Sequence, residues 1–139
     1  MGGKSKRPQI KSADKIPDPI MPQSSNDSHP LFCFRYLRNG FGIEDLPKAL
    51  QAKLALSLGV IARYSWQDCT LATRHSQIGT ELLGVEHVKH TKVAEFDEVS
   101  KYTIFRYTGD NHPMVGVRAG DVFHVLWIEQ KFGDVYDHG

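Results

Sequence analysis

Clustered apolar positions predict a small sheet in the last third of the chain. From Lys101 onward, runs rich in Val, Ile, Phe, Tyr and Trp are separated by short clusters of Gly, Asp, Asn and Pro. These clusters occupy residues 108–113, 119–121 and 129–134, and each is short enough to connect neighbouring strands as a hairpin. We therefore expect a meander of three or four antiparallel strands in this part of the chain.

A helical period marks the segment from Glu44 or Asp45 to about Tyr64. Pro47 lies in its expected first turn and Arg63 near its end, positions that suit helix geometry and the helix dipole. The apolar positions that recur at helical spacing are Leu46, Leu50, Leu54, Leu58 and Ile61. They form one stripe, which we expect to face the core of the domain.

A shorter second helix is predicted from Trp66 to about His75. Ser65 precedes it and Asp68 follows three residues later, which is the spacing of a capping box with Asp in place of the usual Glu. The two helices are expected to form a hairpin that packs on one face of the sheet.

The segment 31–37, LFCFRYL, predicts the first strand, because its alternate positions are apolar on both faces. Between residues 77 and 100 the pattern weakens, and a short strand at 86–88 is the only element suggested. The order of elements indicates an α+β fold, an antiparallel sheet of four to five strands with a helical hairpin on one face. We expect this single domain to span residues 30–139.

Residues 1–29 differ in composition from the rest of the chain. They contain four of the seven prolines, several Ser and Asn residues and few large apolar side chains. Such a segment buries too little apolar surface to offset its ordering entropy, so we expect a disordered tail. Five basic residues within its first fifteen positions could contact nucleic acid or an acidic partner, but a solvated tail is the explanation that the composition favours.

Charge and composition exclude several classes of protein. The net charge is +1, so a strongly basic nucleic-acid-binding surface is not indicated. No apolar run is long enough to cross a membrane, and no apolar stretch follows the first basic residues, so we expect a cytoplasmic protein without a membrane partner. The two cysteines form neither a metal motif nor a disulfide framework, and His87 and His90 have no evident third ligand. No metal or other cofactor is expected.

Polar residues within the predicted strands are the main indication of function. Metal-free RNA cleavage requires a base for the 2′-OH proton, an acid for the 5′ oxygen and cations near the phosphate. The chain offers Arg106 and Arg118 as phosphate ligands and His124 or His138 as the proton-transfer group. Tyr136 and Lys131 are the auxiliary candidates.

Each of these residues also has a purely structural interpretation. Arg106 and Arg118 could face solvent at strand ends, and His124 could be a core histidine bonded to backbone. Tyr136 could pack as an aromatic, while His138 could belong to a solvated end of the chain.

The length of one turn decides whether Arg118 and His124 share a face of the sheet. A three-residue loop of Ala119, Gly120 and Asp121 places Gly116 opposite His124, and both polar side chains then point the same way. A two-residue loop of Ala119 and Gly120 turns them to opposite faces. Because three-residue loops commonly hold Gly in the left-handed position that Gly120 would take, we expect the first register.

The run VGVRAGDVFHVLWIEQKFGDVYDH resembles the central hairpin of the RelE/ParE-like superfamily of bacterial toxins. In that superfamily a strand ending in Arg is followed by a small-residue turn and a second strand with a polar position, matched here by Arg118 and His124. The resemblance implies a ribosome-dependent or free mRNA endoribonuclease that inhibits translation, with an antitoxin protein and RNA or the ribosome as partners. On the ParE branch it implies an inhibitor of DNA gyrase.

Two further interpretations accompany this one. The ending FGDVYDHG is similar to that of an uncharacterised group of short bacterial proteins. The alternative function is a non-catalytic, protein-binding or phage-related accessory domain, whose apolar Phe and Trp surface docks a partner.

Overall fold

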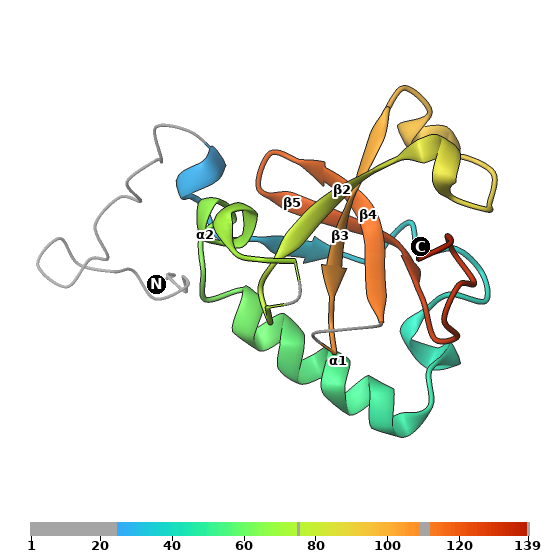
Figure 1. Cartoon of the computed structure of the whole chain (residues 1–139), viewed down its shortest axis with the longest axis horizontal. Helices are drawn as coiled ribbons and strands as arrows, with labels where there is room; N and C mark the ends of the chain where they lie inside the picture. The colour runs from blue at the N-terminus through green and yellow to red at the C-terminus, as the bar shows by residue number, and fades with distance from the viewer. Residues whose placement is uncertain (1–24, 75, 109–111, 139) are drawn as a thin grey trace, which may run out of the picture.

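The protein is an α+β domain built on one five-stranded sheet, as the sequence predicts (Figure 1). The computed structural model describes residues 25–74, 76–108 and 112–138. The strand order is β1-β5-β4-β3-β2. The strands are β1 (Leu31–Cys33), β2 (Thr80–Gly84), β3 (Lys101–Arg106), β4 (Pro113–Ala119) and β5 (Val122–Ile128).

Strands β2 to β5 are antiparallel, but β1 runs parallel to β5, so the sheet is mixed rather than wholly antiparallel. A parallel neighbour requires a crossover connection, and here both helices and three strands lie between β1 and β5 in the chain. The strand expected over 31–37 ends at Cys33, because the chain turns where the Leu37 N–H donates to the Phe34 carbonyl.

Helix α1 (Lys48–Ile61) carries the expected apolar stripe. It begins after Pro47, and a 3₁₀ turn at Ile43–Asp45 replaces the first part of the expected helix. Leu54 and Ile61 are fully buried, and Leu50 and Leu58 pack partly buried beside them. The stripe therefore faces the core, where it joins Phe105 of β3 and Phe123 of β5.

Helix α2 (Trp66–Leu71) begins with the capping box that the sequence predicts. The Asp68 N–H donates to the Ser65 hydroxyl at 3.0 Å, and the Ser65 N–H donates to the Asp68 carboxylate at 3.0 Å. The helix ends earlier than expected because the backbone becomes extended at Ala72. Trp66 and Cys69 bury its inner face against the same core as α1.

The opposite face of the sheet is covered by irregular segments rather than by helices. Val88 and Val93 precede β3, Val135 and Tyr136 follow β5, and all four pack on that face with Trp127. The weak pattern between residues 77 and 100 corresponds to β2 and two 3₁₀ turns, and residues 85–87 form one of these turns rather than part of a strand. Both faces of the sheet are therefore buried.

The N-terminal tail expected over residues 1–29 lies almost wholly outside the described residues. Within the described part, Ser25–Asp27 form a 3₁₀ turn, and the Trp66 N–H donates to the Ser28 carbonyl at 2.8 Å. Residues 25–28 thus contact the domain beside α2.

The expected register of the β4–β5 hairpin is wrong. Ala119 pairs with Val122 and Val117 with His124, so the loop consists of two residues, Gly120 and Asp121. Gly120 has φ of 63° at the first loop position, which is where a two-residue type II′ turn requires glycine. The left-handed glycine is therefore present, but it closes a shorter loop than expected.

Candidate functional site

Arg118 lies on the helix-covered face, away from the other candidates. Its guanidinium carbon lies 4.2 Å from the centre of the Trp66 ring, and its Nη2 donates to the Asn26 Oδ1 at 2.9 Å. Burial lowers the pKa of Arg118, an effect that Asp121 opposes. The expected Arg118–His124 site is therefore wrong, because the observed register places the two side chains on opposite faces of the sheet. Arg118 instead contacts Asn26 and Trp66, and so links residues 25–27 to α2.

His124 occupies the other face, between two aromatic rings. Its ring centre lies 5.8 Å from that of Tyr36 and 5.1 Å from that of Phe96. Its Nδ1 is buried without a hydrogen-bond partner. The described contacts of His124 are therefore aromatic, and none of them joins it to Arg106 or Arg118.

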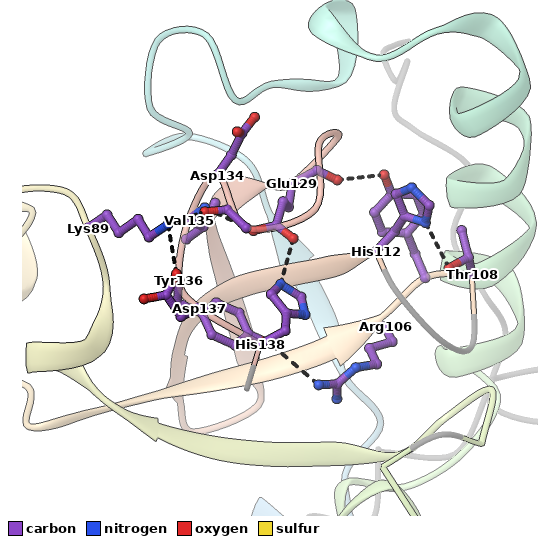
Figure 2. A network of polar contacts seen from close by, with 12 residues as sticks. Lys89, Arg106, Thr108, His112, Glu129, Asp134, Val135, Tyr136, Asp137 and His138 are labelled. Carbon is purple, nitrogen blue, oxygen red and sulfur yellow. Dashed lines mark hydrogen bonds and ion pairs between the residues drawn. The ribbon is translucent and has the colours of Figure 1, made fainter.

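Three of the predicted residues do meet, at the far end of the same face. The Arg106 Nη2 lies 3.4 Å from the Tyr136 hydroxyl oxygen. The Tyr136 and His138 rings stack with centres 4.3 Å apart and planes at 9° (Figure 2). Lys131 is exposed in the turn after β5, where its carbonyl accepts a hydrogen bond from the Asp134 N–H. Arg106, Tyr136 and His138 therefore form the candidate site.

Glu129, which the sequence did not single out, completes the cluster. Its side chain is fully buried, with Oε1 2.7 Å from the His138 Nε2 and Oε2 accepting the Val135 N–H at 2.9 Å. Figure 2 shows His138 pointing toward this carboxylate. Because a carboxylate only accepts, it favours a proton on Nε2 and leaves Nδ1 as the nitrogen that exchanges protons.

A local signal for Glu129 existed in the sequence. It directly follows the apolar run 122–128, so it continues the line of β5, and its N–H donates to the Pro113 carbonyl at 3.0 Å. An acidic residue that prolongs a buried strand requires a partner for its charge. Because residues 129–134 were expected to form an exposed turn, no buried partner was expected for Glu129.

Arg106 is the buried cation of the site. Its Nη2 lies 2.5 Å from Glu81 Oε1, and Arg74 Nη1 lies 3.1 Å from the other oxygen of the same carboxylate. The Arg106 Nε is buried without a hydrogen-bond partner. An unsatisfied guanidinium N–H is a strong donor, and a phosphate oxygen is a ligand that would satisfy it.

Burial also sets the protonation of two tyrosines at the site. It raises the pKa of Tyr136 to about 12, an effect that Arg106 opposes and that Glu81 and Glu129 reinforce. Burial and Glu129 raise the pKa of Tyr107, whose hydroxyl donates to the Glu129 carbonyl at 2.9 Å. Both hydroxyls therefore stay protonated at neutral pH; the Tyr107 hydroxyl donates to the Glu129 carbonyl, and the Tyr136 hydroxyl accepts from the Arg106 guanidinium.

The cluster is almost closed to solvent. The side chains of Arg106 and His138 are each 7% exposed, and Phe132 covers the His138 ring with centres 4.1 Å apart. Glu81 and Arg74 are more open, with side chains 22% and 58% exposed. The Glu81–Arg74 pair is therefore the more solvent-exposed part of this polar network.

Neither a metal centre nor a membrane span is evident in the described part of the chain. Within residues 25–74, 76–108 and 112–138, no group of three or more His, Cys, Asp or Glu side chains is placed to hold a metal ion. His87 contacts Glu86 at 3.4 Å, and the His90 Nε2 lies 2.9 Å from the Asp134 carbonyl. Among the same residues, no helix combines the length and apolarity needed to cross a bilayer.

Comparisons with known proteins found no match to any protein-family model, curated protein or solved structure. The function of the protein is therefore inferred from the geometry of the candidate site.

Proposed function

We propose that the protein is a RelE-like, metal-independent endoribonuclease that cleaves mRNA and so inhibits translation. The observation that carries the proposal is the buried Glu129–His138 pair, with Nε2 and Oε1 2.7 Å apart, beside the Tyr136 hydroxyl and the Arg106 guanidinium. A histidine oriented by a carboxylate is a common general base, and Arg is a preferred ligand of phosphate.

The proposed reaction assigns one role to each side chain. His138 Nδ1 takes the proton of the ribose 2′-OH, whose oxygen attacks the adjacent phosphorus. The bond from phosphorus to the 5′ oxygen breaks, and that oxygen takes a proton from the Tyr136 hydroxyl. The products are a 2′,3′-cyclic phosphate and a 5′-hydroxyl end, and the imidazolium and the tyrosinate then exchange their proton through solvent. Glu129 stabilises the imidazolium while it carries the proton.

Arg106 supplies the stabilisation of charge. Negative charge grows on the non-bridging phosphate oxygens as the 2′ oxygen attacks, and a donor already fixed in a dry site stabilises it most. Glu81 and Tyr136 hold the guanidinium in place at 2.5 and 3.4 Å, and its Nε remains free to donate to the phosphate. Lys131, exposed in the following turn, would attract the RNA backbone.

This function implies particular partners and a location. An enzyme that cleaves mRNA acts in the cytoplasm on RNA, either free or on the ribosome. A cell that makes it requires a neutralising antitoxin protein. Expression of the wild-type chain should therefore arrest growth, and expression of an inactive His138 variant should not.

A second candidate is a non-catalytic protein-binding domain. It is favoured by the burial of the candidate site and by the exposure of several large apolar side chains outside it. Those exposed side chains are Leu31, Leu56, Leu71 and Leu82.

The deciding experiment is an RNA cleavage assay with purified full-length protein, in the presence of EDTA and with and without ribosomes. His138→Gln and Tyr136→Phe should each lower the cleavage rate by about 10²–10⁴-fold, the usual contribution of a general acid or base. His87→Gln is the matched control, because the His87 side chain is 63% exposed and lies outside the site.

Two further observations complete the test. A substrate with 2′-deoxyribose at the cleaved position should be inert, and the product should carry a 2′,3′-cyclic phosphate. If the wild type cleaves no RNA under either condition, or if both site variants retain full activity, the endoribonuclease proposal is overturned and the binding domain takes its place.

A further inference from the structure

A pocket separate from the candidate site lies on the helix-covered side of the sheet, between α1 and the end of β3. Its volume is about 350 Å³, within the range of small-ligand sites. Its lining residues are Lys53, Leu56, Ser57, Gln77, Tyr107 and Thr108. None of these is among the residues that form the proposed catalytic cluster.

Ser57 is the unusual member of this lining. It lies between Leu54 and Ile61 on the core-facing side of α1, where the helical pattern calls for an apolar residue. Ser57 is only 2% exposed, and its Oγ is buried without a hydrogen-bond partner. A buried, unsatisfied hydroxyl is unfavourable, and a ligand in the pocket would satisfy it.

The remaining side chains indicate the charge and shape of that ligand. Lys53 is the charged member of the lining, and no acidic residue accompanies it among the lining residues described. Gln77 adds an amide, which both donates and accepts, and Leu56 adds an exposed apolar surface. The pocket thus offers one cation, neutral hydrogen-bonding groups and apolar contact, a combination that suits a planar base joined to one phosphate.

Tyr107 connects this pocket to the proposed catalytic cluster. Tyr107 is one of the residues that line the pocket, and its hydroxyl donates to the Glu129 carbonyl at 2.9 Å. The carboxylate of the same Glu129 holds His138. A ligand in contact with Tyr107 would therefore lie next to a residue that is hydrogen-bonded to Glu129 of the proposed catalytic Glu129–His138 pair.

We propose that this pocket binds one nucleotide of a single-stranded RNA chain, with Lys53 on its phosphate and Ser57 and Gln77 on its base or ribose. The inference rests on the proposed ribonuclease function, because it assigns the pocket to the same substrate.

The first test measures binding without catalysis. The full-length His138→Gln protein is titrated with the four 5′-mononucleotides, and binding is followed by amide NMR shifts of the residues that line the pocket. Lys53→Gln and Ser57→Val should each weaken binding by about 5–10-fold, the range expected for one lost hydrogen bond or charge contact. Lys48→Gln is the matched control, since Lys48 is an exposed lysine of α1 outside the pocket.

The second test measures cleavage in the otherwise wild-type protein. Lys53→Gln should raise KM for RNA by a similar factor and leave kcat unchanged, because the pocket holds substrate without touching the reacting atoms. Near-UV circular dichroism of the two tryptophans reports whether each variant keeps its packing.

The outcomes separate the two proposals. Nucleotide binding that depends on Lys53 and Ser57 in a protein that cleaves no RNA supports the pocket and overturns the enzyme. Cleavage with an unchanged KM in Lys53→Gln overturns the pocket and leaves the enzyme. Inorganic phosphate that competes as well as any nucleotide shows a simple anion site and also overturns the pocket assignment.

Discussion

The two faces of the sheet are buried by different means. The face under α1 and α2 is closed by regular helices, and its buried side chains include Leu54, Ile61 and Trp66. The opposite face is closed by irregular segments, and it contains Arg106 and Glu129, the two buried charged residues among those that the structure describes. The buried polar side chains of the helix side are hydroxyl groups, among them Ser57.

This difference shows where a small domain can hold functional groups. A helix satisfies its own backbone, so the face beneath it can be filled with apolar side chains that favour burial. Irregular segments have backbone groups that require partners, and the Val135 N–H finds one in the Glu129 carboxylate. The charged groups that hold such segments are also the groups able to perform chemistry.

The largest stability effect is expected from Glu129→Ala. It leaves the Val135 N–H and the His138 Nε2 without their buried acceptor, and breaking a buried pair typically costs about 3–5 kcal/mol. Urea unfolding measures the loss, and the neighbouring Gln130→Ala should change stability by less than about 0.5 kcal/mol. A loss below about 1 kcal/mol for Glu129→Ala would show that the irregular face does not depend on this residue.

On the helix-covered face, Leu54→Ala should lower the free energy of unfolding by roughly 2–5 kcal/mol, because it leaves a cavity in the core. Leu56→Ala, two residues along the same helix, is the control, since Leu56 is 71% exposed. The same unfolding experiment measures both variants. Equal effects of the two substitutions would contradict the orientation of α1.

Alkaline pH should weaken the helix-covered face first. Burial raises the pKa of the Cys69 thiol from 9.0 to about 11, with Asp68 adding to the effect. Between these values the unfolded chain releases the proton and the folded chain keeps it, so stability falls as pH rises. Between pH 9 and 10 this one group should remove about 1 kcal/mol.

Thermal or urea unfolding across this pH range tests the expectation for Cys69. Cys69→Ala should remove the loss of stability of about 1 kcal/mol between pH 9 and 10, whereas the Cys33→Ala variant should still show it. Above pH 10 the buried Tyr136, whose pKa is about 12, should add a loss from the opposite face in both variants. An unchanged slope in Cys69→Ala would show that the thiol ionises alike in the folded and unfolded chains.

The smallest effect has the opposite sign. Ser57→Ala should raise the free energy of unfolding by about 1 kcal/mol, because it removes a buried hydroxyl without a partner and adds a better helix former. Ser76→Ala is a suitable contrast, since the Ser76 Oγ donates to the Thr73 carbonyl at 2.8 Å and its removal should not stabilise. Destabilisation by Ser57→Ala would mean that the hydroxyl is already satisfied in the unliganded protein.

Local signals predicted the elements better than their pairing. The leucine spacing of α1 and the box formed by Ser65 and Asp68 each depend on residues within one or two turns, and both are present in the structure. The parallel partner of β1 depends on contacts far apart in the chain, which no local pattern encodes. The β4–β5 register depends on whether the loop has two residues or three. Gly120 can adopt the conformation that either loop requires, so its presence did not decide between them.

The residues of the candidate site were also predicted better than their spatial arrangement. Arg106, Tyr136 and His138 were recognisable as residue types with suitable chemistry, and the structure brings them together. Their assignment with Arg118 and His124 failed because a shift of one residue in a hairpin reverses which side chains share a face.

The parallel pairing of β1 with β5 also has a consequence for the order of folding. Leu31 pairs with Val122, about 90 positions away, and closing so long a loop is slow compared with forming the neighbouring hairpins β3–β4 and β4–β5. The meander of β3, β4 and β5 should therefore assemble first and present an unpaired edge to which β1 adds late. During synthesis β1 leaves the ribosome long before β5 does. Its apolar residues therefore have no partner strand until β5 has also been synthesised.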